Sequence, residues 1–208
     1  VVGIGDGTGW YTFYSSVNSA LAVATAGQTI KFFANIVETT STSLTLKDGV
    51  DFDLNGFSYT LSVADDTNMF DTPASAVNVK FTNGGLFRTN AVRTTANNGL
   101  IFRFTAIGNV LTFDNSFVIS NDTEGLIKFG KQTDVYGGVW KGADTFGGGL
   151  MEMDGDCSLN NAIVLMDSDS TINNAGLIND CTILSTSVTN VILINSQGGN
   201  ITNCYIDG

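Results

Sequence analysis

Pairs of acidic residues are the side chains of this sequence whose types and spacing could carry out a reaction. Glycoside hydrolysis needs two carboxyl groups flanking the bond, about 5 Å apart in retaining enzymes and about 6.5–9.5 Å apart in inverting ones. Residues two apart in a strand point to the same face, so Asp51 and Asp53 are one candidate catalytic pair. Asp154 and Asp156 are a second, although Gly155 between them favours a turn. The same acids could equally be solvated groups that keep the surface soluble.

Histidine and basic side chains, which often assist catalytic carboxylates, are scarce in this sequence. The chain has no histidine and only nine lysines and arginines. The three arginines, Arg88, Arg93 and Arg103, form no recognisable motif with an acidic cluster. Oxygen ligands such as those of Asp154 and Asp156 would suit Ca²⁺, but the loop pattern of known calcium sites is absent. We therefore predict no metal site and no cofactor.

Two aromatic residues, Tyr136 and Trp140, are candidate ligand-binding residues because an aromatic face can stack on a sugar ring. A tryptophan in a strand can equally belong to the core or to a subunit interface. Both interpretations stay open from the sequence.

Composition excludes several partners. The net charge is −11, whereas nucleic acids and anionic membranes attract basic patches, so we expect neither nucleic-acid binding nor membrane insertion. No apolar run approaches the ~18–20 residues of a membrane span. Many Gly, Asn, Ser and Thr residues, together with fourteen Phe, favour short strands joined by tight turns. We expect one domain that is a piece of a longer protein.

A recurring pair of residues, polar and then small, divides the chain into repeats. It stands at Asn55-Gly56, Asn83-Gly84, Asn115-Ser116, Gly137-Gly138, Asn161-Ala162, Asp180-Cys181 and Asn203-Cys204, with spacings of 28, 32, 22, 24, 19 and 23 residues. Such a period is typical of stacked repeats that share one core. A second series of apolar segments begins at Gly99, Gly125 and Gly149, with spacings of 26 and 24 residues, and at Asn190, which lies 41 residues further on, close to two repeats. We interpret each pair as a corner between two strands.

The chain before the repeats differs from the rest. Residues 15–27 are predicted to form a helix, because apolar residues recur there with helical spacing between Ser16 and Gly27. We expect this helix to cover the open end of the stacked strands. Residues 1–14 are predicted to be an extended, turn-rich segment, and residues 28–208 to form the repeats, which we expect to continue beyond Gly208.

Three features resemble one known family. They are Gly5–Thr8 followed by the predicted helix and Gly27–Ile30, the segment Leu46–Gly56, and the corner asparagines. The chain resembles right-handed parallel β-helix proteins of the pectin-lyase-like group, most of all phage tailspike and tail-fibre members. The resemblance implies an all-β fold, a single-stranded right-handed parallel β-helix with a short N-terminal capping α-helix. It also implies an interior ladder of buried asparagine amides, interrupted at Gly137 and Asp180: Asn55, Asn83, Asn115, Asn161 and Asn203.

The family includes lyases, hydrolases, adhesins and inert virion parts, so the resemblance alone does not choose a function. We predict a non-enzymatic structural and host-attachment module of a phage tailspike or tail fibre. It would form a homotrimer, contact other virion proteins and could recognise a cell-surface polysaccharide, either in the virion or otherwise outside the cell. The alternatives are a secreted polysaccharide lyase or glycoside hydrolase, and a bacterial surface adhesin. An enzyme would gather acids from neighbouring repeats in a groove, whereas an attachment module would carry an apolar or aromatic stripe between subunits.

Overall fold

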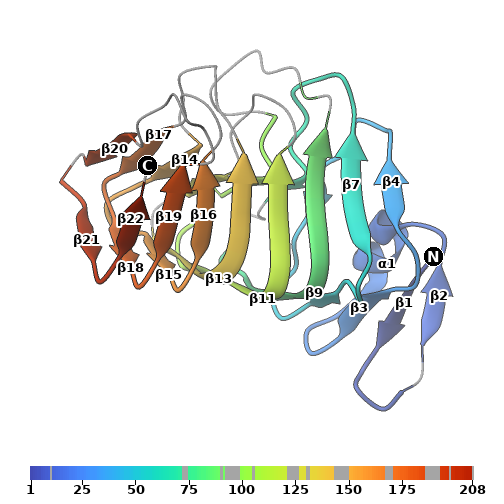
Figure 1. The fold of residues 1–208 in the computed structure, drawn as a ribbon. Coiled ribbons are helices and arrows are strands. Elements are labelled where there is room, and N and C mark those ends of the chain that lie inside the picture. The colour runs from blue at the N-terminus through green and yellow to red at the C-terminus, as the bar shows by residue number, and fades with distance from the viewer. Residues whose placement is uncertain are drawn as a thin grey trace.

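The computed structural model describes residues 1–9, 11–71, 75–89, 91, 99–104, 106–120, 127–129, 132–142, 150–166, 171–185, 193–196 and 198–207. Within them the protein is all-β, with strands that pair mostly in parallel and a single helix, α1 (Val17–Val23) (Figure 1). Two sheets contain these strands, a large one and a small one.

The large sheet has two limbs that meet at the corners. The first limb contains β3 (Thr29–Phe32), β6 (Asp51–Asp53), β15 (Ser158–Asn160), β18 (Leu177–Asn179) and β21 (Asn200–Thr202). The second limb contains β4 (Ile36–Glu38), β7 (Ser58–Ser62), β16 (Ile163–Met166), β19 (Thr182–Ser185) and β22 (Tyr205–Asp207). Three long strands pass through the corner and belong to both limbs: β9 (Asn78–Thr89), β11 (Asn109–Ser120) and β13 (Thr133–Gly142).

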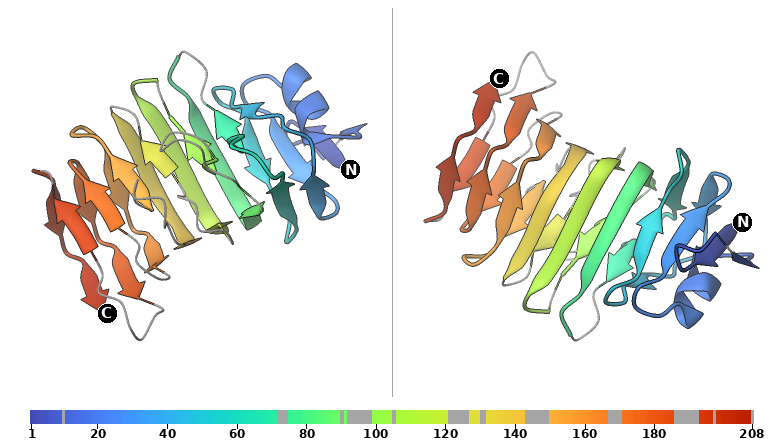
Figure 2. Two further views of the ribbon diagram at one scale, coloured as in Figure 1. Left: turned by 90° about the horizontal axis from the view of Figure 1, so that it is seen from above. Right: turned by 90° about the horizontal axis from the view of Figure 1, so that it is seen from below.

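The small sheet takes one strand from each of seven repeats. In spatial order they are β20 (Leu193–Ser196), β17 (Thr171–Asn174), β14 (Met151–Met153), β12 (Ile127–Phe129), β10 (Phe102–Arg103), β8 (Phe70–Asp71) and β5 (Leu44–Thr45). From β3 onward the described chain passes through the first limb, the second limb and the small sheet in that order. Each strand then pairs in parallel with its counterpart in the next repeat, so that the repeats follow one another from end to end (Figure 2).

All seven predicted corners share one backbone conformation. Their first residues have φ between 50° and 76°, in the left-handed region that L-residues rarely adopt. Asn, Asp and Gly are the residues that tolerate this region best. Gly137 and Asp180 therefore do not interrupt the series, because they have the same conformation as the asparagines. The predicted corners are confirmed.

The prediction of an interior asparagine ladder is wrong. All five corner asparagines are exposed rather than buried, and a single amide–amide hydrogen bond joins two of them in the described structure, from Asn115 Nδ2 to Asn83 Oδ1 at 3.4 Å. Asn55 and Asn83 instead donate to the Phe32 carbonyl and to the Asp53 carboxylate. The corner selects asparagine for its backbone conformation and not for an amide stack.

Small residues follow the corners because the chain is close to its neighbours there. A Cβ atom on Gly84 would overlap the Phe57 carbonyl, and one on Gly138 would lie 2.9 Å from the Phe113 Cβ atom. Ser116, Ala162 and Cys181, which follow other corners, are buried, and Cys204 is half-buried. Gly56 is the exception, because a Cβ atom there would meet no other atom within 4 Å.

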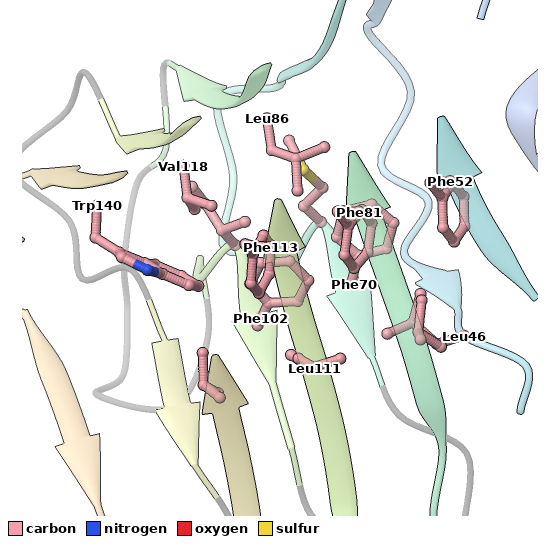
Figure 3. Close-up of a cluster of buried hydrophobic side chains, with 14 of the residues drawn as sticks. Leu46, Phe52, Phe70, Phe81, Leu86, Phe102, Leu111, Phe113, Val118 and Trp140 are labelled. Atoms are coloured by element: carbon pink, nitrogen blue, oxygen red, sulfur yellow. The ribbon is translucent and has the colours of Figure 1, made fainter. Parts of the chain in front are cut away.

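Aromatic rings stack between the two sheets at the inward positions of successive repeats (Figure 3). Phe52, Phe81 and Phe113 lie in register in the first limb, with ring centroids 4.9 and 5.1 Å apart and nearly parallel planes. Phe70 and Phe102 stack in the same way in the small sheet, at 5.1 Å. Because each repeat contributes to one continuous core, a single repeat would leave its ring half-covered.

The second apolar series corresponds to the small sheet. Phe102, Ile127, Met151, Ile172 and Ile194 occupy one register row, so the predicted gap of two repeats before Asn190 is filled by β17. The segment starts Gly125, Gly149 and Asn190 themselves lie outside the described residues.

The N-terminal region is more ordered than the turn-rich segment that we predicted. β1 (Val2–Gly5) pairs antiparallel with both β2 (Thr12–Tyr14) and β3, and so extends the large sheet past the first repeat. α1 is capped by Ser16, as predicted, but it ends at Val23, because the backbone of Ala24 is already extended. In the described part of the chain no helix is long and apolar enough to cross a membrane.

Substitutions at Asn161 separate the backbone role of a corner from an amide role. The side chain is exposed and φ is 53°. We expect Asn161→Ala to destabilise the protein by about 1 kcal/mol, because alanine resists this conformation, and Asn161→Gly to melt close to the wild type. Thermal melts followed by circular dichroism measure both. Equal losses in the two variants would show that the amide, rather than φ, is needed.

Candidate functional site

The structure places the first candidate acids on the outer face of β6, where each already has a partner. Asp53 forms an ion pair of 2.9 Å with Lys31 and accepts hydrogen bonds from the amide of Asn55 and the side chain of Asn83. Asp51 accepts from the backbone amide of Lys80 at 2.9 Å. Neither carboxylate lines any of four hollows on the described surface.

The pKa of Asp53 also disfavours an acid role. Burial acts to raise this pKa, but the hydrogen bonds from Lys31, Asn83 and Asn55 outweigh it and hold it below its usual value of 3.8. A glycosidase acid instead needs a raised pKa so that it stays protonated. Asp53 is therefore an ionised group that ties β3 to β6.

The second candidate pair lies elsewhere. Asp154 and Asp156 are exposed residues of the turn between β14 and β15, which the amide of Cys157 closes by donating to the Asp154 carbonyl. β15 is four strands from β6 in the large sheet, or about 19 Å at the usual strand spacing. The structure does not bring the two pairs together. Among the described residues, no group of three His, Cys, Asp or Glu side chains could hold a metal ion.

The arginines are engaged in structural contacts. Arg88 is fully buried, and its guanidinium donates to the carbonyls of Val63, Asp65 and Thr89. Arg103 forms an ion pair of 2.9 Å with Asp71. Arg93 lies outside the described residues.

A charged row on the small sheet was missed by the sequence analysis. Asp71, Arg103, Lys128 and Glu152 are register neighbours, and the second ion pair, between Lys128 and Glu152, measures 2.6 Å. Arg103, Lys128 and Glu152 lie within the segments of the second apolar series, which is the signal that could have located them. The carboxylates of Asp71 and Glu152 are three strands apart, about 14 Å, too far to flank one glycosidic bond.

The structure excludes one of the two aromatic candidates and retains the other. Trp140 is 0% exposed, its ring packs edge-on against Phe113 at 4.7 Å, and Nε1 donates to the Gly137 carbonyl. It cannot stack on a sugar, so this part of the prediction is wrong and the core interpretation holds. Tyr136 is 41% exposed on the outer face of β13, between Thr112 and Asn160, and stays a candidate.

A groove lies along the corner between the limbs and has a volume of about 410 Å³. Phe57, Phe87 and Phe117 line it together with corner residues of neighbouring repeats. The sequence analysis did not single out these rings, although Phe57 and Phe117 each stand two residues after a corner asparagine. That recurrence is the signal that could have located the groove.

The outer face of the second limb carries apolar residues where a water-exposed sheet usually carries polar ones. Two adjacent register rows supply them, and we call the following five residues the apolar face: Ile119, Val139, Ile163, Leu165 and Leu184. Ile163 is 41% exposed, and the other four are half-buried. Lys141 and Thr182 are the polar residues within these rows.

No protein-family model matches the chain, and no match to it is found among curated proteins or among solved structures. The resemblance to phage β-helix proteins therefore stays a prediction that rests on this chain's own residues.

Replacing Asp53 tests its structural role. Because its pKa is lowered in the folded state, its contribution to stability is present above pH 3.8, the usual value, and is lost as the pH falls through the folded pKa. We expect Asp53→Asn to cost roughly 1 kcal/mol at neutral pH and much less in acid. Urea unfolding at several pH values measures this difference, with Asp154→Asn as an exposed control that changes little. A loss that is the same at every pH would refute the ion-pair explanation.

Proposed function

We propose that the chain is a right-handed, single-stranded parallel β-helix with α1 at its N-terminal end. The support is the same order of limbs and small sheet in each described repeat, with parallel pairing between counterparts. Connections between parallel strands are right-handed in nearly all proteins, which fixes the expected hand.

We infer that this β-helix is a structural and host-attachment module of a phage virion appendage, a tailspike or tail fibre. The apolar face is the observation that carries this inference, because an attachment module of this kind assembles side by side with copies of itself. Contiguous exposed apolar residues mark surfaces that another protein covers. Three copies, each turning its apolar face inward, would bury the five residues together, and the virion or another extracellular setting is the expected location.

A polysaccharide lyase or glycoside hydrolase is the weaker proposal. Glu152 and Asp154 line one of the described hollows together, and Glu38 lines another. Glu152 already forms an ion pair of 2.6 Å with Lys128, which disfavours a catalytic role for this pair. A bacterial adhesin would share the fold without needing the apolar face.

One charge placed in the apolar face tests the assembly. We expect the wild-type chain to have the mass of three chains in size-exclusion chromatography with light scattering. Ile163→Lys should shift it to the mass of one chain, because a second ammonium, close to that of Lys141, would be buried between the subunits.

The matched control is Tyr205→Lys, which adds the same charge to an exposed aromatic residue in the same register row but outside the apolar face. The control should keep the wild-type mass. A wild-type chain that stays monomeric at all concentrations would overturn the assembly proposal.

A further inference from the structure

We propose that the corner groove binds a neutral glycan chain, an inference that rests on the attachment role and names its ligand and site. The groove is the 410 Å³ hollow that crosses the corners from β4 to β11. Its volume falls in the range of ligand sites, which combine apolar and aromatic walls with a few well-placed polar groups.

Two glycines lie at the floor of the hollow. Ser58, Gly85 and Phe117 are register neighbours on the outer face, so β9 places no side chain of its own between Ser58 and Phe117 in this row. A Cβ atom on Gly85 would overlap the Phe87 ring, so that ring lies directly over the glycine. With Gly84 beside it, the floor of the groove consists of backbone and one aromatic ring.

Aromatic rings stand on both sides of this floor. Phe57 directly precedes Ser58, the register counterpart of Phe117, so the two rings come from the strands on either side of β9. Phe117 is 46% exposed, and Phe57 is half-buried against the core. The C–H face of a sugar ring is apolar and fits against such a ring. Two platforms in one groove suit a chain of sugars better than a single one.

Amides supply the polar rim. Asn35 Oδ1 accepts from the backbone amide and the hydroxyl of Ser58, so its NH₂ group remains available within the described structure. Asn115 donates to Asn83, which leaves the Asn115 carbonyl oxygen available there. An amide presents both donors and an acceptor, as neighbouring hydroxyls on a sugar require.

The absence of charged side chains in the groove favours a neutral glycan over an acidic one. No residue that lines the groove is charged, although the chain as a whole has a net charge of −11. An acidic polysaccharide would meet no cation in the groove and would be repelled by the protein's overall field. The aromatic and amide lining therefore fits a neutral oligosaccharide.

The test screens the wild-type protein against a printed array of neutral and acidic oligosaccharides, followed by calorimetry with the neutral sugar that binds best. We expect binding to neutral sugars only. Phe117→Ala should weaken it roughly tenfold by removing one platform. Asn115→Asp should also weaken it several-fold, while the fold persists, because Asp180 already occupies an equivalent corner at φ 53°.

Tyr205→Ala is the matched control, since Tyr205 is an exposed aromatic residue in the Phe117 register row but outside the groove. Its binding should equal that of the wild type. The proposal is overturned if the wild type binds no neutral sugar, if it binds only acidic ones, or if Tyr205→Ala loses as much affinity as Phe117→Ala. Loss of self-association in Phe117→Ala with sugar binding intact would also overturn it, because the groove would then be a protein contact.

The Ile163→Lys variant separates this site from the assembly. If it becomes monomeric and still binds the sugar, both proposals stand. If the wild type is a monomer that binds the sugar, the assembly proposal is refuted and the groove proposal is supported. If the wild type assembles but binds no sugar, only the groove proposal is refuted.

Discussion

At every corner the backbone of this protein takes a left-handed conformation, with φ between 50° and 76°, and the other features follow from that bend. The bend lets one short strand end and the next begin in a new direction without a loop. Because it recurs about once per 20–30 residues, counterpart strands meet in register and their inward rings stack, as Phe52, Phe81 and Phe113 do. Asn, Asp or Gly must occupy the bend, since other residues would pay a conformational penalty there.

Because the repeats stack around a shared core, side chains that could bind a partner must lie on the outer surface. Inward positions are filled by the shared core, so differences between repeats are confined to outward side chains and to corners. Gly85 adds no side chain beside Phe117, where the groove lies, and a change from polar to apolar residues between β11 and β19 makes the apolar face. The acids of the first limb bind neighbouring strands, as the Lys31–Asp53 ion pair and the hydrogen bond from the Lys80 amide to Asp51 show. Binding and assembly are therefore the roles that we propose for the outer surface.

Sequence reasoning located the corners because a steric rule restricts which residues they accept. It misjudged their side chains, since a buried amide ladder and an exposed left-handed bend select the same residue type. β1 was missed because Gly3 and Gly5, which read as turn residues, are instead covered by the ring of Tyr11. The groove could not be predicted either. It depends on which outward positions are adjacent across strands, and repeats of unequal length conceal that register.

Spin-label distances test the stacked register most directly. Lys80 and Thr202 are 122 residues apart in sequence, but they lie in one outward row, five strands from each other. Labels at these positions, in protein diluted with unlabelled chains, should be separated by about 24 Å. Moving the first label from Lys80 to Tyr136 should shorten the distance to about 14 Å, because two strands are removed. A distance that does not shorten with this move would contradict the stacking on which the groove and the apolar face depend.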